Sequence, residues 1–355
     1  MTEAFDGVDA LPDDAAALLA PAGDEFQLSA AWFRALQDAA RPDGARPLWL
    51  LHREAGAAVA LLPLWRAADG RLAALTAPYT CLFRPLVAAA ADPAVLARAG
   101  AAFGRACRRA GPLRLDALDL DWPGWPPLLA GFRRAGLATL RFAHFGNWRC
   151  DVAGLDWPAY LAGRPGDLRE TIRRRLARAG RDPAIGFELI AGGDALAAGI
   201  AAYENVYARS WKQEEPFPRF AAIVMRAAAA AGVLRLGVLR RQGVPVAAQY
   251  WTVTGGTATV HKLAHDEAER KLSPGTVLTA LLLRHMLEHE RVRAVDFGRG
   301  DDGYKAGWTG TRRQRSGVLL CPPWQPAGLA ALGRHVAGFV AAALRKNLGS
   351  GHAAG

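Results

Sequence analysis

The chain has 355 residues, of which 51% are apolar and 22% charged, a balance that indicates a globular protein and argues against a disordered one. Lysine and arginine outnumber aspartate and glutamate by 44 to 33, and this excess of +11 favours an anionic partner: a nucleotide-like cofactor, nucleic acid, an anionic glycan or a membrane surface. The four cysteines lack Cys-x-x-Cys spacing, which argues against a zinc site and a disulfide framework and predicts a reducing, cytoplasmic location.

Neither a secretory signal nor a membrane span is predicted. Residues 1–14 are acidic and lack the basic-then-apolar pattern of a signal peptide. No uncharged apolar run reaches the ~18–20 residues that a bilayer-spanning helix needs. We therefore expect a protein without a transmembrane segment.

The first half of the chain predicts a helix-rich beginning and then a mixed unit. Residues 1–47 are expected to be mainly helical, with one helix capped by Ser29. Glycine turns separate three short strands, and a proline-rich break at 121–127 precedes the last helix. The predicted strands are 48–53, 57–65, 72–77 and 113–118, and the predicted later helices are 93–110 and 128–136.

The same order of elements recurs in the second half. We interpret it as a tandem duplication, although the common grammar of α/β proteins would produce a similar likeness. The first copy lacks a charged loop, since 78–85 contains only Arg84 as a charged residue, so the second copy is expected to be the active one. The predicted elements are helix 167–179, strand 186–190, helices 194–211 and 218–231, strands 233–239, 244–253 and 257–264, helix 273–290 and strand 294–297.

A helix start flanked by cations dominates the second half. Arg270 and Lys271 lie in a loop directly before Ser273, which is expected to cap the helix, and Gly275 lets a diphosphate approach the backbone closely. The free N–H groups of the first helical turn and the helix dipole favour an anion there. The alternative is an ordinary capped helix that crosses over a sheet.

The C-terminal segment, 327–348, predicts an amphipathic helix. We expect its apolar face to pack on the preceding domain, with a membrane-surface helix as the alternative. The spaced apolar residues are Leu329, Leu332, Val336, Phe339, Val340 and Leu344, with Arg345 and Lys346 at the end. The predicted domains are a degenerate unit 1–145, an active unit 146–325, and this helix with its tail, 326–355.

Five ordered motifs carry a resemblance to a known family. They are Asp-Leu-Arg-Glu-Thr-Ile-Arg-Arg-Arg at 167–175, Tyr-Glu-Asn-Val-Tyr-Ala-Arg-Ser-Trp at 203–211, Leu-Ser-Pro-Gly at 272–275, Asp-Phe-Gly-Arg-Gly-Asp at 296–301 and Tyr-Lys-Ala-Gly-Trp at 304–308. This set resembles the GNAT-superfamily acyltransferases of the cellulose-biosynthesis (CelD/BcsL) type, which are related to Fem-like transferases. The resemblance covers nearly all of 48–322.

The resemblance implies a fold, a donor and an acceptor. The fold class is α/β (α+β), with tandem GNAT-like units, each a mixed and mostly antiparallel sheet flanked by helices. The donor is acetyl-CoA or another acyl-CoA, with no metal, and the acceptor is an amine or hydroxyl on a small molecule, glycan or peptide, which suggests polysaccharide biosynthesis. One departure leaves the donor open: the usual turn Gln/Arg-x-x-Gly-x-Gly/Ala has a single glycine at 270–276, so an aminoacyl-tRNA donor remains an alternative.

Four residues are candidates for catalysis. Tyr304 is the candidate acid for the departing thiolate, Lys305 could pair with a phosphate or with developing negative charge, and His261 or Asp302 could accept the acceptor's proton. Each has an alternative: Tyr304 packing at a domain edge, Lys305 as a solvated surface lysine, His261 as a core histidine, and Asp302 as a turn former. Asp296 is expected to make an internal hydrogen bond. Strand alternation along 257–264 predicts that His261 and Leu263 share one face and that Lys262 and Ala264 share the other.

The remaining site predictions concern binding. The arginine-rich helix 167–181 has an outer basic face that could hold an anionic acceptor or a CoA phosphate, or simply be solvated. Glu214 and Glu215 could recognise a cationic amine, with solvated loop acids as the alternative. The predicted cofactor-binding residues are Leu263, His265, Arg270, Lys271, Ser273, Gly275 and Thr276, and the predicted acceptor-binding residues are Trp211, Glu214, Arg174 and Arg178. A non-catalytic module that binds an anionic ligand is a further alternative.

Overall fold

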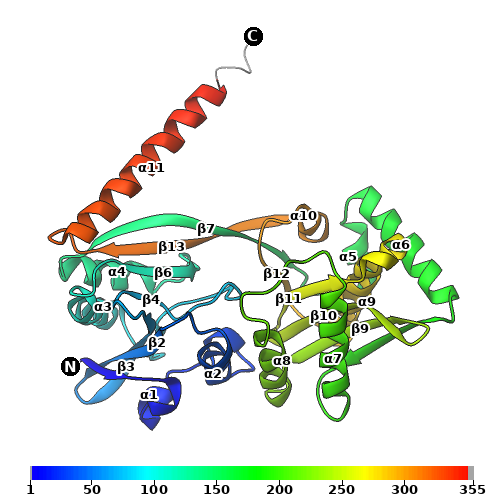
Figure 1. The fold of residues 1–355 in the computed structure, drawn as a ribbon, viewed down its shortest axis with the longest axis horizontal. Coiled ribbons are helices and arrows are strands. Elements are labelled where there is room, and N and C mark those ends of the chain that lie inside the picture. Colours follow the sequence, from blue (N-terminus) through cyan, green and yellow to red (C-terminus); the bar gives the residue numbers. More distant parts are fainter. Residues whose placement is uncertain (1, 351–355) are drawn as a thin grey trace.

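Two units with the same order of elements lie side by side in one continuous sheet (Figure 1). The computed structural model describes residues 2–350, with side chains described as far as residue 338. Within this part of the chain the sheet has 13 strands, in the order β1-β2-β3-β4-β6-β13-β7-β12-β11-β10-β9-β8, with β5 beside β3. The predicted mixed, mostly antiparallel sheet flanked by helices is therefore confirmed.

The first unit begins with a short strand and helices, which a three-stranded meander follows. A helix, a strand, a second helix and a long strand complete it. Its strands are β1 (Thr2–Phe5), β2 (Arg46–Glu54), β3 (Ala57–Arg66), β4 (Leu72–Ala74), β5 (Leu86–Val87), β6 (Leu113–Leu118) and β7 (Ala138–Asp151). Its α-helices are α1 (Asp13–Ala16), α2 (Ala30–Ala39), α3 (Pro93–Cys107) and α4 (Trp125–Arg134). The Ser29 hydroxyl accepts the N–H of Trp32 at 3.4 Å, which confirms the predicted cap of α2.

The second unit repeats this order after two additional helices, α5 (Trp157–Ala162) and α6 (Gly166–Arg181). Its strands are β8 (Ile185–Ile190), β9 (Leu234–Arg241), β10 (Val244–Thr254), β11 (Thr257–His265), β12 (Ala294–Arg299) and β13 (Thr311–Cys321). Its helices are α7 (Ala195–Ala208), α8 (Phe220–Ala230), the 3₁₀ helix η3 (Glu267–Leu272), α9 (Pro274–Glu288) and α10 (Gly303–Thr309). In both units the third strand of the meander is parallel to the strand that follows the crossover helix, β4 to β6 and β11 to β12.

The last strand of each unit is exchanged between the units. β7 pairs with β12 of the second unit, and β13 pairs with β6 of the first. The two exchanged strands also pair with each other from Thr311–Arg149 to Cys321–Ala138 (Figure 1). The sequence analysis predicted neither strand, and the boundary it placed between residues 145 and 146 falls inside β7.

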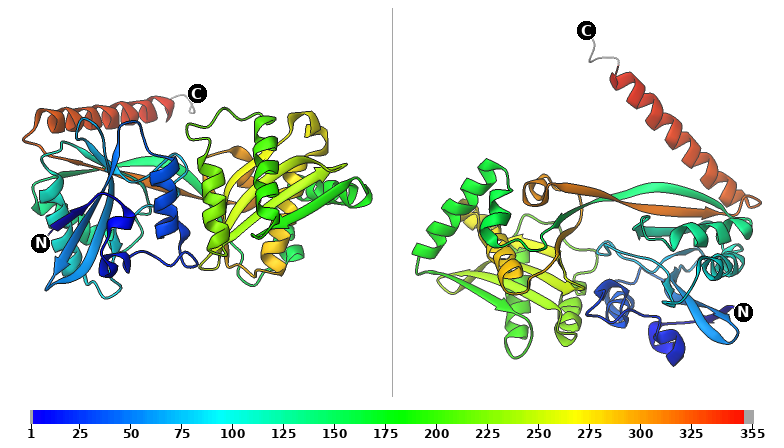
Figure 2. Two further views of the ribbon diagram at one scale, coloured as in Figure 1. Left: turned by 60° about the horizontal axis from the view of Figure 1, so that its bottom comes forward. Right: turned by 180° about the vertical axis from the view of Figure 1, so that it is seen from behind.

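In the second unit, the two faces of the sheet are covered by different helices. Ala248 of β10 packs in the core with α7 and α8, whereas its neighbour Ala247 packs in the core with α5, α6 and α9. Helix α2 of the first unit lies beside α8 (Figure 2), and the rings of Trp32 and Phe220 meet edge to face at 5.5 Å. The core on this face is therefore shared by both units.

The C-terminal helix α11 (Pro326–Ser350) projects away from the body of the molecule (Figure 1). Ala331 is buried, but Leu329 and Val336 are 56% and 58% exposed. The prediction that this helix packs its apolar face on the domain is therefore wrong for the part whose side chains are described. The predicted side-chain positions from residue 339 onward and the tail 351–355 lie outside that part. Among the described residues, no helix combines the length and apolarity needed to cross a bilayer.

Candidate active site

The two parallel strands of the second unit separate where a cavity begins. β11 and β12 pair only along Thr257–Thr259 and Ala294–Asp296, and beyond Thr259 no strand of the described chain pairs with β11 on that side, although Gly298 lies against the Val260 carbonyl. Ligands of α/β sheets commonly bind beyond the carboxyl ends of diverging parallel strands. The cavity there, of about 160 Å³, is called the wedge cavity and is lined by Pro78, Tyr79, Cys81, Lys212, Tyr250, Val260, His261, Lys262, Leu263, Phe297, Arg299, Asp302, Tyr304 and Lys305.

A β-bulge at His261 marks this separation. Tyr250 pairs with Lys262 and the next residue of β10 pairs with Val260, so His261 is an extra residue in β11. The bulge interrupts strict alternation, and the predicted shared face of His261 and Leu263 is wrong. The His261 ring stacks on Tyr250 at 5.3 Å, whereas Leu263 points toward the first turn of α9.

The first turn of α9 has no side-chain cap, and its first two residues, Pro274 and Gly275, are buried. Ser273 has left-handed backbone angles (φ 52, ψ 52) and its side chain makes no cap hydrogen bond, so the predicted side-chain cap is wrong. The N–H groups of Gly275 and Thr276 therefore receive no side-chain acceptor. A Cβ added to Gly275 would lie 3.2 Å from Nδ1 of His265, an atom that is buried and has no recorded hydrogen-bond partner. The tip thus has the uncapped amides and narrow approach that a phosphate group requires.

Cations flank this tip on the side of α6. Arg270 and Lys271 are exposed at the end of η3, which replaces the predicted irregular loop. Arg175 of α6 donates to the Lys271 carbonyl at 2.7 Å, so α6 is held beside the tip. Arg174 and Arg178 are exposed on α6, on the face of the sheet that carries α9. The structure does not bring them together with Trp211 and Glu214.

Lys305 and Tyr304 belong to the wall of the wedge cavity formed by the segment after β12. Lys305 is only 4% exposed; its ammonium donates to the carbonyls of Arg299 (2.7 Å) and Gly300 (3.4 Å) and pairs with Asp302 at 3.0 Å. It is therefore not a solvated surface lysine, because it holds this turn. Although Tyr304 is 46% exposed, desolvation of its phenol and then the Asp302 carboxylate raise the pKa of Tyr304, and the phenol keeps its proton at neutral pH.

His261 is uncharged at neutral pH. Burial lowers the pKa of His261 to about 4, and its Nε2 lies 2.9 Å from the Thr252 hydroxyl. The predicted internal hydrogen bonding of Asp296 is confirmed: Asn147 donates to it at 2.6 Å and Arg313 at 2.6 Å. This buried group ties β12 to both exchanged strands.

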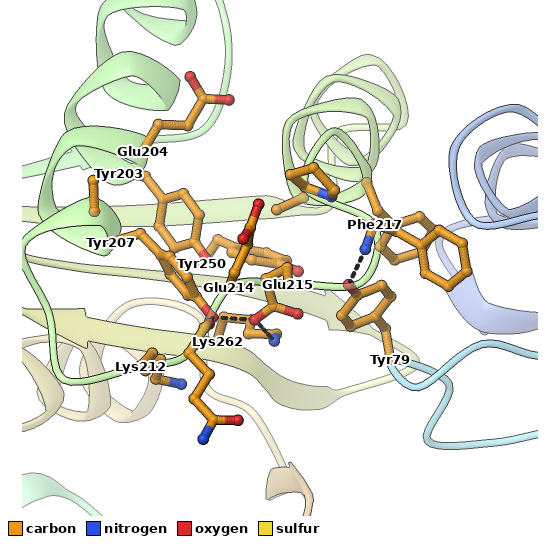
Figure 3. A pocket seen from close by; sticks show the side chains of 15 residues that line it. Tyr79, Tyr203, Glu204, Tyr207, Lys212, Glu214, Glu215, Phe217, Tyr250 and Lys262 are labelled. Carbon is orange, nitrogen blue, oxygen red and sulfur yellow. Dashed lines mark hydrogen bonds and ion pairs between the residues drawn. The ribbon is translucent and has the colours of Figure 1, made fainter.

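A second, larger cavity lies beside the wedge cavity, on the face covered by α7 and α8 (Figure 3). Its volume is about 400 Å³, and it is called the aromatic cavity. Tyr79 reaches it from the loop after β4 of the first unit, so both units build it. The lining residues are Tyr79, Tyr203, Glu204, Tyr207, Ala208, Lys212, Gln213, Glu214, Glu215, Phe217, Pro218, Phe220, Ala221, Tyr250 and Lys262.

Glu215 is the most engaged polar group of the aromatic cavity. Tyr207 and Lys262 both donate hydrogen bonds to its carboxylate (Figure 3). Burial alone would raise the pKa of Glu215, but the hydrogen bonds from Lys262 and Tyr207 outweigh it and lower the pKa. The alternative of a solvated loop acid is therefore wrong for Glu215, although Glu214 is exposed.

The two cavities share Tyr79, Lys212, Tyr250 and Lys262. The two cavities are therefore adjacent, and these four side chains contribute to the walls of both. The sequence analysis did not identify Tyr79 or Lys212, since neither lies in a recognisable motif. Trp211, predicted to bind the acceptor, lines neither cavity; its half-exposed ring lies 4.3 Å from that of His265, tilted by 41°. Among the described residues, no three His, Cys, Asp or Glu side chains gather as a metal site.

The family comparison matches the part of the chain that builds this site. Residues 166–306 match the family model described as an acetyltransferase (GNAT) domain. The fold is GNAT-like. Comparison with curated protein sequences gives no match. The match covers the uncapped helix, the diverging strands and both cavities except for the residues from the first unit.

Solved structures similar to this GNAT-like chain share its fold at low sequence identity. One is the C-terminal domain of a protein described as a lysylphosphatidylglycerol synthetase from Agrobacterium fabrum (16% identity, 90% of this chain, 94% of that chain, TM-score 0.55). Another is a conserved protein of unknown function from Bacteroides thetaiotaomicron VPI-5482 (13% identity, 90% of this chain, 100% of that chain, TM-score 0.57). A third is FemX (10% identity, 81% of this chain, 95% of that chain, TM-score 0.53).

Proposed function

We propose that the second unit transfers an acyl group from a CoA thioester to an amine or hydroxyl acceptor. One observation carries this proposal: β11 and β12 diverge near an uncapped helix tip, and the cavity between them adjoins a second cavity lined by both units. A donor with a diphosphate and a long arm would fit the helix tip and the wedge cavity. A separate acceptor would fit the aromatic cavity.

The residues divide into a donor set and an acceptor set. The first-turn amides around Gly275, with Arg270 and Lys271 beside them, would bind the diphosphate. Acyl-CoA supplies an activated thioester carbonyl, and the unpaired β11 edge beyond Thr259 offers backbone N–H groups to polarise it. Tyr304 holds a proton for the departing sulfur, and the acceptor occupies the aromatic cavity.

The finer parts of the proposal follow from the family resemblance. Acetyl-CoA is the favoured donor, and glycans related to cellulose biosynthesis are the first acceptors to test. The four cysteines are buried and free, which supports the cytoplasm as the location. The GNAT-domain match supports a transferase of this kind.

Binding measurements test the donor. Isothermal calorimetry with CoA, acetyl-CoA and longer acyl-CoAs is expected to show binding that Arg270→Ala/Lys271→Ala weakens about tenfold or more. Arg108→Ala/Arg109→Ala is the matched control, because it removes two adjacent exposed cations in the first unit. Equal CoA affinity in the two double variants would refute the assigned phosphate site.

An aminoacyl-tRNA donor is the second candidate. The observation that favours it is the row of exposed arginines on α6, beside the α9 tip. Phosphate contacts of this kind make binding steeply salt-dependent. Titration with tRNA at two salt concentrations separates the candidates: salt-sensitive tRNA binding lost in Arg174→Ala/Arg178→Ala supports this donor, and absence of tRNA binding removes it.

A further inference from the structure

Three of the chain's five lysines line the wedge cavity. The lysines are Lys212, Lys262, Lys271, Lys305 and Lys346, and arginine supplies every other permanent cation. Lys212, Lys262 and Lys305 are the three in the cavity wall. Arginine stays protonated in proteins, whereas a desolvated lysine can release its proton. The chain therefore places its titratable cations where the proposed chemistry occurs.

The three lysines differ in their partners. Lys305 is held by two carbonyls and Asp302, and Lys262 is bound to Glu215. For the ammonium of Lys212 the described residues provide no recorded hydrogen bond or ion pair. Its recorded neighbours are the rings of Trp211 at 5.7 Å and Tyr207 at 5.9 Å. Of the three lysines, Lys212 is thus the one whose ammonium has no acceptor among the described residues.

Lys212 also lies where donor and acceptor would meet. It lines both the wedge cavity and the aromatic cavity, and it comes from the segment between α7 and α8 (Figure 3). In the wedge cavity the other side chains able to accept a proton are engaged: His261 with Thr252 and Asp302 with Lys305. In the aromatic cavity Glu215 is bound by Tyr207 and Lys262, whereas the exposed carboxylates of Glu204 and Glu214 line that cavity alone. Among the side chains that line both cavities, Lys212 is therefore the available base.

We propose that Lys212 is the catalytic base that takes the proton from the acceptor amine before acyl transfer. The inference rests on the proposed function and adds that the acceptor's nucleophile enters through the aromatic cavity as an ammonium. It extends the candidate bases beyond His261 and Asp302.

Electrostatics at this position favour the neutral amine. Burial and then the charge of Lys262 lower the pKa of Lys212 to about 8, with a smaller contribution from Lys305. The carboxylates of Glu215 and Asp302 oppose this shift, and His265, which also faces Lys212, is itself shifted toward its neutral form. A base with this pKa is increasingly competent as the pH rises through about 8.

The reaction balances with groups already described. The acceptor ammonium gives one proton to the Lys212 amine, and the freed nitrogen lone pair forms a C–N bond with the thioester carbon. The C–S bond breaks, and the departing sulfur takes a proton from Tyr304. The acylated nitrogen releases its remaining extra proton, which restores the phenol, and the Lys212 ammonium loses its proton to water.

Two substitutions separate a base from a fixed cation. Lys212→Arg keeps the charge but cannot accept a proton, and Lys212→Met keeps neither. Assays would use acetyl-CoA with glucosamine, tyramine, a lysine-containing peptide or water as acceptor. We expect both variants to lose at least about 100-fold in kcat while retaining CoA affinity. The rise in wild-type kcat near pH 8 should be absent from the pH profiles of both variants. Added methylamine should partly restore the turnover of the Lys212→Met variant. A Lys212→Arg variant with wild-type turnover and pH profile overturns the proposal.

A second measurement does not depend on turnover. Competitive labelling with acetic anhydride across pH, read by mass spectrometry, is expected to give Lys212 a midpoint near 8, with exposed Lys271 labelled in the same digest for comparison. A midpoint above 10 overturns the inference. Absence of CoA binding by the wild type instead refutes the proposed function, so the two failures can be told apart.

Discussion

In both units a crossover helix follows the third meander strand, but the two helices, α3 and α9, begin differently. In the first unit the Asp92 carboxylate accepts the N–H of Val95 at 2.7 Å, which caps α3 with a negative charge. In the second unit Ser273 leaves the first turn of α9 without a side-chain cap. A carboxylate occupies in α3 the kind of position that a phosphate would take in α9. Equivalent elements can thus differ in function through one capping residue.

The first unit has a different use. The loop after β4 contributes Tyr79 to the aromatic cavity, where its ring stacks on Phe220 at 4.6 Å. Its hydroxyl accepts the N–H of Phe217 at 3.3 Å. We therefore propose that the first unit shapes the acceptor site, while the second holds the donor.

The largest expected effect comes from making α9 resemble α3. Ser273→Asp introduces a carboxylate at the open tip, and aspartate tolerates left-handed backbone angles. Two like charges about 4 Å apart repel by roughly 4 kcal/mol near a protein surface, so CoA affinity should fall at least about 100-fold. Calorimetry measures this change. Asp92→Ser is the reciprocal control and should leave CoA affinity unchanged; an unaltered Ser273→Asp variant would remove the contrast between the tips.

The next effect tests the contribution of the first unit to the acceptor site. Tyr79→Ala removes a stacked wall of the aromatic cavity, a loss of roughly 1–3 kcal/mol, so kcat/KM for the acceptor should fall about 10- to 100-fold. CoA affinity should change less than about twofold. Steady-state kinetics and calorimetry measure the two quantities. Tyr79→Phe keeps the ring and should lose less; a parallel loss of CoA affinity would contradict the division of labour.

A smaller effect concerns the α3 cap. Asp92→Ala removes the hydrogen bond to Val95 and should lower the free energy of unfolding by about 1 kcal/mol. Urea denaturation monitored by circular dichroism measures it. The variant gains no CoA site, because the segment before α3 lacks the two adjacent cations of η3. New CoA binding in the isolated Asp92→Ala change would show that the cap alone excludes the ligand.

Ion pairing inside the first unit gives a pH-dependent effect. Arg98 donates to both oxygens of Glu54 at 2.7 Å, and this pairing lowers the pKa of Glu54 to about 2. A lowered carboxyl pKa stabilises the fold above the unfolded value and loses this effect as pH falls toward 2. Glu54→Gln should therefore cost less than about 1 kcal/mol at neutral pH, and this cost should shrink steadily as pH falls toward 2. Thermal unfolding across pH measures the difference.

At the boundary between the units, Glu25 is expected to have the opposite dependence of stability on pH. Burial raises the pKa of Glu25, so the folded state binds its proton more tightly than the unfolded chain does. This stability is present below the unfolded pKa and declines as pH rises through the folded pKa. Glu25→Gln should raise the melting temperature slightly at neutral pH, with no gain in acid. A destabilised Glu25→Gln variant at pH 7 would contradict the burial of an ionised carboxylate there.

The sequence predicts local elements better than long-range ones. The meanders 48–77 and 233–264 and the helix after them are marked by glycine turns, apolar patterns and a well-placed Pro274, and the structure contains them. β7 and β13 carry interspersed arginines, and their positions depend on strands more than a hundred residues away. No local pattern specifies such pairing.

The residues of the candidate site also differ in how far the sequence alone identifies them. Arg270, Lys271 and Gly275 lie in one short segment whose chemistry is readable from its order. Tyr79 and Lys212 enter the cavities from distant parts of the chain, so only the folded arrangement identifies them. The bulge at His261 also escaped the period-two argument, because an inserted residue changes the face of each residue after it.

The exchange of β7 and β13 determines how synthesis of the chain must proceed. As the polypeptide leaves the ribosome, the rest of the first unit is complete near residue 151, but β6 cannot pair with β13 until Cys321 has emerged. Until then the edge of β6 presents unpaired backbone N–H and C=O groups. A chain truncated or paused before β13 would therefore expose an edge prone to aggregation, and we expect neither half of the chain to fold stably when produced separately.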